Sequence, residues 1–139
     1  MRILGAKLQV VPSDSGRMTE KLTRTMIEAA RVIKETTGAF LTDQLNNQDQ
    51  VAAYHKMAEE IWSQTDGQVD GFVQSVGTGA SARGNAEGLG RHNGRMRIVA
   101  VEPSESPVLS GGKAGAHKID GIGRGFCATA LAGWRRRSG

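Results

Sequence analysis

The sequence predicts an α/β fold, a three-layer α/β/α arrangement with a mainly parallel sheet. Amphipathic segments with a helical period cover residues 19–36 and 51–65. Short apolar segments of strand length cover residues 69–76 and 96–101. Strands and helices alternate along the chain, which is the pattern of a sheet whose parallel strands are joined through helices. In such folds, ligands bind beyond the carboxyl ends of the strands.

Length and composition indicate a globular protein of a reducing compartment. The chain has 139 residues, of which 38% are hydrophobic and 23% charged, so it is long enough to bury a core. No apolar run approaches the ~20 residues of a membrane helix, and no signal peptide opens the chain. The single cysteine, Cys127, excludes an internal disulfide. We therefore expect a cytoplasmic location and no membrane partner.

The net charge of +4 does not indicate a nucleic-acid binder. Arg135, Arg136 and Arg137 stand together near the end of the chain, so the remainder is close to neutral. Nucleic-acid-binding domains carry a basic face with interleaved aromatic side chains. Aromatic residues make up only 4% of this chain, and we expect no nucleic-acid partner.

The first part of the chain is expected to hold one long helix between short strands. In chain order, its elements are the end of a helix stopped by Gly5, a strand at 7–11, a loop at 12–16, a helix at 19–36 stopped by Gly38, a strand at 39–41 and a polar loop at 42–50. A chain that begins within an element, with no visible N-terminal cap, is the first indication of truncation.

The second part of the chain alternates helix and strand. Its expected elements are a helix at 51–65, a turn at Asp66-Gly67, a strand at 69–76, a helix at 81–92, a strand at 96–101 and an irregular segment at 104–124. The helix at 81–92 is poor in large apolar residues and contains Gly84, Gly88 and Gly90. Each glycine costs about 1 kcal/mol relative to alanine in a helix.

The loop Gly77-Thr78-Gly79-Ala80-Ser81 joins a strand to a helix and has the composition of an anion site. Glycines let the backbone turn tightly and approach an anion, and free N–H groups at a helix start point toward a phosphate. The hydroxyls of Thr78 and Ser81 would add donors. Ordinary strand-to-helix turns have a similar composition, because they need a positive φ and an N-cap. The loop residues alone leave both interpretations open.

Four stretches, taken together, have the form of a known enzyme family. They read LGAKLQVV near the start, TDQLNN at 42–47, EEIWSQTDGQVDGFVQSVGTGAS at 59–81 and VEPSESPVLSGGKAGAHKIDGIGRGF at 101–126. They resemble the cysteine synthase (O-acetylserine sulfhydrylase) and cystathionine β-synthase family, pyridoxal phosphate (PLP)-dependent enzymes of fold type II, which is tryptophan synthase β-like. The resemblance covers residues 2–126, and the last stretch matches almost residue by residue.

The resemblance implies a set of PLP- and substrate-binding residues. The family's GTGGT loop, which holds the PLP phosphate, corresponds to Gly77, Thr78, Gly79, Ala80 and Ser81. Ala80 departs from the family glycine and is unstrained only if its φ is negative.

Gln44 matches a glutamine near the substrate α-carboxylate, where an amide N–H₂ suits the role of donor. Gly121, Ile122 and Gly123 match a loop beside the cofactor ring. Without the resemblance, Gln44 reads as an exposed loop residue and 121–123 as a flexible glycine loop.

The resemblance also bears on Glu102 and on possible partners of the chain. Glu102 could be the acidic residue that binds a ribose in dinucleotide-binding folds. In the family it resembles, however, the glutamate of the Val-Glu-Pro sequence is chiefly part of the strand end, and we favour that role. Lys113, His117 and Lys118 correspond to a surface loop that in family members faces serine acetyltransferase; an ordinary solvated loop is an equal interpretation. A homodimer and a small amino-acid substrate are further expectations from the family.

Departures from the family indicate an internal fragment. The Schiff-base lysine, the asparagine-containing Ser/Thr loop and the serine at the pyridine nitrogen match no residue here, so no catalytic residue is assigned. We expect residues 1–47 to be a remnant of the small domain and 48–126 part of the large PLP-phosphate-binding domain. Residues 127–139, CATALAGWRRRSG, resemble nothing in the family and form a separate tail.

We expect a fragment of a PLP-dependent cysteine synthase-like enzyme that is inactive alone. The complete enzyme would replace the leaving group of an O-activated serine with sulfide to form cysteine. Two alternatives remain. One is a dinucleotide-binding module, although the glycine spacing is not G-x-G-x-x-G. The other is a non-catalytic binding or assembly remnant. No metal ligands are expected.

Overall fold

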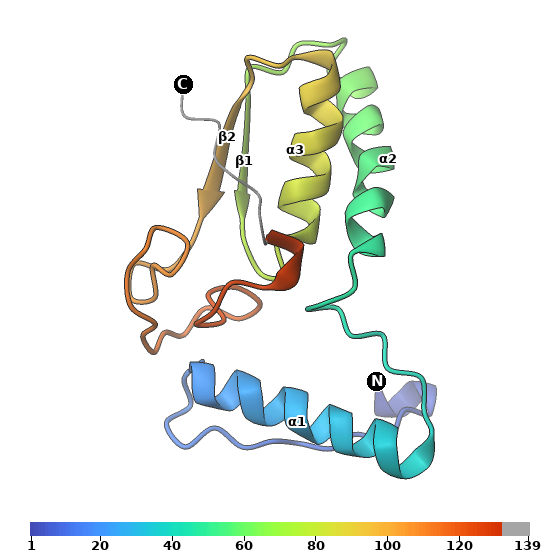
Figure 1. Ribbon diagram of the computed structural model, residues 1–139, viewed down its shortest axis with the longest axis vertical. Helices are drawn as coiled ribbons and strands as arrows, with labels where there is room; N and C mark the ends of the chain where they lie inside the picture. The colour runs from blue at the N-terminus through green and yellow to red at the C-terminus, as the bar shows by residue number, and fades with distance from the viewer. Residues whose placement is uncertain (132–139) are drawn as a thin grey trace.

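The structure is a computed structural model that describes residues 1–131. Its elements, in chain order, are a 3₁₀ helix Arg2–Leu4, α1 Glu20–Thr37, α2 Asp49–Gln64, β1 Gly71–Ser75, α3 Ala80–His92, β2 Arg97–Val101 and a second 3₁₀ helix, η2, Thr129–Leu131 (Figure 1). Residues 132–139 of the expected tail lie outside the described residues. Among the described helices, none is long and apolar enough to cross a membrane.

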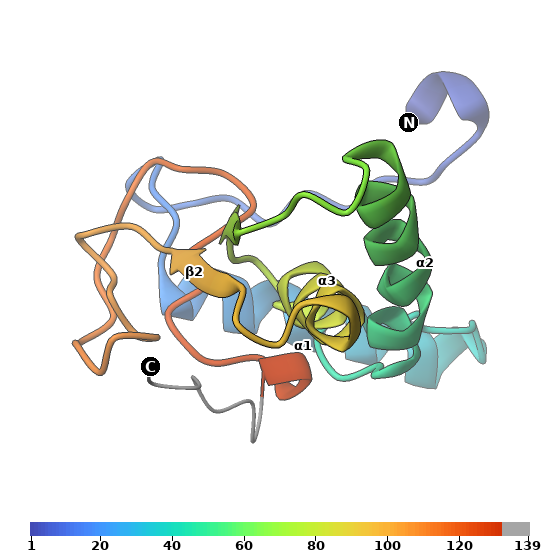
Figure 2. The ribbon, with the colours of Figure 1, turned by 90° about the horizontal axis from the view of Figure 1, so that it is seen from above.

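The two described strands are parallel, which confirms the predicted α/β class. β1 pairs with β2 in a register that runs from Gly71↔Arg97 to Ser75↔Val101. α3 connects the strands as a crossover helix, and α2 packs along α3 on the side away from the sheet (Figures 1 and 2). Each strand therefore ends at the same edge, where the glycine loop and Glu102 lie.

The expected strands at 7–11 and 39–41 do not form. A strand is stable only when its N–H and C=O groups pair with another strand, and no described segment pairs with either one. Val10 is 74% exposed and Phe40 is 90% exposed. These two predictions from local composition were wrong because a strand depends on a partner distant in sequence. Among residues 1–131, the only pairing near these segments is an isolated bridge between Met18 and His117.

Local signals set the bounds of α1. The Thr19 side chain accepts a hydrogen bond from Leu22 N at 3.1 Å, which caps the first turn. Gly38 ends the helix in the left-handed conformation at φ 68°. Thr23 is its only buried residue, and Ile27, Val32 and Ile33 stay exposed. Leu22, Met26, Ala29 and Ala30 of the stripe that predicted this helix are half-buried, so α1 is only partly covered.

Close contact between α2 and α3 explains the glycines of α3. A Cβ on Gly84 would lie 2.4 Å from Val51 O, and a Cβ on Gly88 would lie 2.3 Å from Ala58 Cβ. Ala58 itself is fully buried. Gly90 has nothing within 4 Å of such an atom. The low helix propensity of Gly84 and Gly88 is thus offset by packing that any side chain would prevent.

Polar pairs line the exposed rim of the same helix contact. Glu87 on α3 bonds His55 Nε2 of α2 at 3.1 Å and Arg83 Nε at 2.7 Å. Burial raises the pKa of Glu87, but the hydrogen bonds from Arg83 and His55 outweigh it and hold the pKa below its usual value. One turn further on, the His92 ring stacks on Trp62 with centroids 4.7 Å apart. These contacts fix the rotation of α3 about its axis.

The two faces of the sheet differ in their covering. Phe72, Gln74, Ile98 and Ala100 lie on the half-buried face, toward α3. Their neighbours Val73, Val99 and Val101 lie on the opposite face and are 64%, 45% and 43% exposed. A parallel sheet normally has both faces covered, so this apolar face lacks a covering layer among the described residues.

We predict opposite effects for alanine at two glycines of α3. Gly88→Ala should lower the free energy of unfolding by about 1–3 kcal/mol, because the new methyl collides with Ala58 Cβ and forces the helices apart. Gly90→Ala should raise it by up to about 1 kcal/mol, because its surroundings are open and alanine favours the helix. Urea denaturation measures both. Equal effects at the two positions would contradict the packing account.

We also predict that the purified chain self-associates. The exposed valine face and the unpaired strand edges invite pairing with other copies. Sedimentation velocity should show oligomers or aggregates, and Val73→Lys combined with Val99→Lys should shift the population toward monomer. Val10→Lys, an exposed valine outside the sheet, is the matched control. A sharp monomer peak for the unaltered chain, with a cooperative thermal transition, would rule the prediction out.

Candidate functional site

The glycine loop turns sharply between β1 and α3. Gly79 is the N-cap residue of α3 and has φ 85° and ψ −10°, a left-handed conformation that favours glycine. Ala80 begins the helix, and it is not among the residues with positive φ. The alanine that replaces a family glycine at this position is therefore unstrained, as its helical position requires.

Backbone donors converge at this loop without acceptors. Arg83 N closes the first helical turn on Gly79 O at 2.9 Å, and Ala80 N makes a long 3.4 Å contact with Thr78 Oγ1. Within residues 1–131, no acceptor pairs with the remaining loop and first-turn N–H groups, those of Gly77, Thr78, Gly79, Ser81 and Ala82. Free N–H groups and the positive end of the helix dipole make the start of α3 electropositive.

Two neighbouring segments press against the loop where it has no side chains. A Cβ on Gly77 would lie 2.4 Å from Gly121 O, and a Cβ on Gly79 would lie 2.2 Å from Leu131 Cγ. The structure thus brings Gly121 to Gly77, two positions that the sequence assigned to one site. Leu131 packs with Val76 and Ala82 beneath the loop.

Gln44 lies in an exposed turn that reaches the loop only indirectly. Its backbone carbonyl accepts a hydrogen bond from Gln50 Nε2 at 2.6 Å. Thr129 N donates to Leu45 O at 3.2 Å, and Thr129 Oγ1 donates to Asn46 Oδ1 at 2.8 Å. The turn that holds Gln44 is therefore tied to η2, which in turn supports the glycine loop through Leu131.

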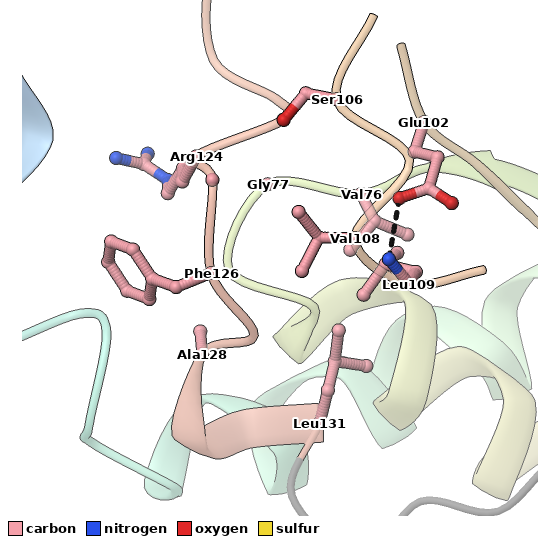
Figure 3. A pocket seen from close by; sticks show the side chains of 12 residues that line it. Val76, Gly77, Glu102, Ser106, Val108, Leu109, Arg124, Phe126, Ala128 and Leu131 are labelled. Atoms are coloured by element: carbon pink, nitrogen blue, oxygen red, sulfur yellow. Dashed lines mark hydrogen bonds between the residues drawn. The ribbon is translucent and has the colours of Figure 1, made fainter. Parts of the chain in front are cut away.

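Glu102 has a structural role at the end of β2. Its carboxylate accepts hydrogen bonds from Leu109 N at 2.7 Å, from Ser110 N at 2.8 Å and from Ser110 Oγ at 2.6 Å. Figure 3 shows the bond to Leu109 at the rim of a cavity. The carboxylate holds the following loop in place, which accounts for Glu102 without a ribose.

His117 is not a surface residue. It is 2% exposed, its Nε2 donates to Gly123 O at 2.6 Å, and its Nδ1 accepts from Ile119 N at 3.3 Å. The expectation that it shares a surface loop with Lys113 and Lys118 was wrong for this residue, although both lysines are exposed. The histidine instead pins the loop 121–123, in which Ile122 is half-buried, against the strand end.

A small cavity lies behind the glycine loop, next to Gly77 and Arg124 (Figure 3). Its volume is about 20 Å³, which is room for roughly one water. Ser106 Oγ and Arg124 Nε are buried there without hydrogen-bond partners. Small-molecule pockets occupy about 300–1,000 Å³, so this cavity among the described residues is too small for a pyridoxal ring.

The chain matches one protein family over most of its length. The family described as "Pyridoxal-phosphate dependent enzyme" matches residues 1–136. The chain belongs to this family. From the sequence, we expected the resemblance to end at Phe126, and the family match extends ten residues further. The separate tail at 127–139 and the domain boundaries stay predictions.

Individual relatives are cysteine synthases or closely related enzymes. Cysteine synthase B of Campylobacter jejuni is 35% identical over 130 residues, which is 93% of this chain and 42% of that protein. Cysteine synthase of Staphylococcus aureus is 33% identical and covers 91% of this chain and 39% of that protein. This chain therefore spans about two fifths of the length of these relatives.

Solved structures agree with the sequence relatives. A cysteine synthase (OASS) from Entamoeba histolytica superposes with a TM-score of 0.78 at 40% identity, covering 92% of this chain and 37% of that chain. An O-ureido-L-serine synthase superposes with a TM-score of 0.81 at 26% identity, covering 94% of this chain and 40% of that chain. The fold is therefore that of PLP enzymes of fold type II.

Two features of this family member's loop escaped the sequence interpretation. One is Leu131, which fills the space beneath Gly79 and comes from the segment expected to be unrelated. The other is a hydrogen bond from Gln74 Nε2 of β1 to Ser81 Oγ of α3. A signal for the second was present, because a glutamine on the inward side of an apolar strand breaks the usual pattern. Among residues 1–131, no cluster of His, Cys, Asp or Glu could hold a metal ion.

Proposed function

We propose that this chain provides the PLP-phosphate-binding segment of a cysteine synthase-like enzyme. The observation that carries the proposal is the cluster of N–H groups at the start of α3 that find no acceptor within residues 1–131, those of Gly77, Thr78, Gly79, Ser81 and Ala82. A phosphate dianion there would accept several of these bonds and interact favourably with the helix dipole. Because the chain belongs to a PLP-dependent family, we propose that the phosphate bound here is that of PLP.

The loop residues fit a phosphate in size and chemistry. Gly77 and Gly79 carry no side chain that could cover the free N–H groups, and the space that a Cβ would take is filled by Gly121 O and Leu131. The hydroxyls of Thr78 and Ser81 would be further donors to the phosphate. Ala80 would contribute to the phosphate site as the first residue of α3. The segment Gly121-Ile122-Gly123 lies next to the loop, since Gly121 O is close to Gly77. Its two glycines have no side chains, so this segment would leave space for the cofactor ring.

In the proposed enzyme, Gln44 binds the amino-acid substrate. Its amide would donate to the α-carboxylate, and the turn around it is tied to the loop through Thr129. PLP, when bound, supplies an electron sink for replacing the leaving group of an O-activated serine with sulfide. The role of these residues is to hold the phosphate and orient the carboxylate.

Other features of the proposed enzyme come from the family alone. Residues 1–47 would belong to a small domain and 48–126 to a large domain, with 127–139 as a tail. The proposed location is the cytoplasm. A homodimer and a complex with serine acetyltransferase are the proposed assemblies, and Lys113 and Lys118 remain exposed for such a contact.

We propose that no lysine of this chain serves as the covalent catalyst. Every lysine of the chain lies among the described residues and is exposed, whereas a lysine that binds PLP must reach the cofactor beside the glycine loop. Lys21 pairs with Asp14 at 3.4 Å at the start of α1. We therefore propose that the chain by itself binds phosphate without catalysing the reaction.

We predict that Gly79→Asp abolishes binding of inorganic phosphate, because the added side chain distorts a turn that needs a positive φ and brings a negative charge next to the anion. Calorimetry with phosphate measures the loss. Gly111→Asp is the matched control, since Gly111 has a similar φ of 89° and no neighbour within 4 Å. Because Gly79→Asp also meets Leu131, Thr78→Val serves as a milder second variant and should weaken binding several-fold. Unchanged affinity in both loop variants would refute the phosphate site.

We predict no cysteine formation by this chain from O-acetylserine, sulfide and added PLP above the background of free PLP. The reason is that PLP catalysis needs an amine at the cofactor, and every lysine is exposed. A colorimetric cysteine assay makes the measurement, with a complete cysteine synthase as the positive control. Turnover that disappears when a single lysine is replaced would contradict the prediction and identify the residue.

A further inference from the structure

Gln74 is a polar residue on the half-buried face of β1, where an apolar residue is expected. Along β1 the exposed and half-buried residues alternate, and Gln74 shares the inward face with Phe72. Its partner across the sheet is Ala100, which is also half-buried. A polar side chain at such a position costs free energy unless its hydrogen bonds are made.

Only one half of the Gln74 amide is satisfied. Nε2 donates to Ser81 Oγ in the first turn of α3, whereas Oε1 is buried and has no hydrogen-bond partner within residues 1–131. An incompletely bonded amide of this kind is rare in native structures and calls for an explanation. The hydrogen bond to Ser81 is the one feature of this side chain that reaches the candidate site.

The direction of this bond determines what the Ser81 hydroxyl can do. A hydroxyl has one proton and two lone pairs. Because Ser81 Oγ accepts from the amide, its proton stays available to another acceptor. Within residues 1–131, the Ser81 hydroxyl donates to no protein acceptor; the contact of Asn85 Nδ2 at 2.9 Å is to Ser81 O, the backbone carbonyl. The proton is thus free for a ligand at the loop.

We propose that Gln74 is a positioning residue that sets the Ser81 hydroxyl as a hydrogen-bond donor to the phosphate. This inference rests on the proposed phosphate site at the glycine loop. Gln74 does not touch the phosphate. It acts by occupying a lone pair of Ser81 Oγ and fixing the rotamer, so that the hydroxyl proton points to the anion together with the free N–H groups.

The experiment is a double-mutant cycle read by equilibrium dialysis against radiolabelled inorganic phosphate, a method that tolerates self-association. Ser81→Ala should weaken binding about tenfold, and Gln74→Met about three- to tenfold. In the Ser81→Ala background, Gln74→Met should change the affinity by less than about twofold, because its effect passes through the missing hydroxyl. Gln68→Met, at an exposed glutamine before β1, should have no effect.

An isosteric variant tests the direction of the bond. Gln74→Glu replaces the amide donor with a carboxylate that takes the Ser81 proton, so binding should weaken more than in Gln74→Met. Sulfate, which keeps its charge over this range, allows the same comparison against pH. Affinity of Gln74→Glu for sulfate should recover as the pH falls below about 4 and the carboxyl becomes protonated, whereas the unaltered chain should show no such recovery.

The outcomes separate the two levels of the inference. If the unaltered chain binds phosphate and Gln74→Met binds equally well, the positioning role is overturned and the phosphate site stands. Additive losses in the cycle would likewise overturn it, because they mean that Gln74 acts independently of Ser81. If the unaltered chain binds no phosphate, the site itself is overturned together with the role of Gln74.

Discussion

The position of α3 depends on contacts that leave no room for added atoms. Gly84 and Gly88 let it approach α2 to backbone distance, and Gly79 lets Leu131 pack beneath its first residue. Protein interiors are packed as densely as crystals, so one methyl group at such a point displaces a whole element. Because the loop at the start of α3 carries the free N–H groups, their geometry follows from this packing.

The polar groups around the loop show a consistent asymmetry. Glu102 and His117 are fully engaged with backbone groups, and they hold the loops that surround the site. Within residues 1–131, the N–H groups of Gly77, Thr78, Gly79, Ser81 and Ala82 are left without acceptors. Unpaired donors near a protein interior cost free energy, and a bound anion removes that cost. The two side chains that hold the surrounding loops are therefore satisfied, whereas several N–H groups of the glycine loop are not.

The exposed apolar surfaces have a common explanation. Apolar residues of α1 (Ile27, Val32 and Ile33) and the valine face of the sheet are exposed among the described residues. The relatives are about two and a half times as long as the matched segment, since the chain spans 39% to 42% of them. The amphipathic pattern of each element is that of a larger fold, whose further layers would cover these surfaces.

The sequence by itself determined the helices, the parallel strand pair and the glycine loop. Their signals are local: a cap at Thr19, a stop at Gly38 and an apolar run before Gly77 act within a few residues. Only the tertiary structure decided that residues 7–11 and 39–41 form no strands, because pairing needs a distant partner. It also decided that His117 is buried and that Gln74 reaches Ser81. These depend on segments that meet only when the chain folds, and no local pattern encodes that meeting.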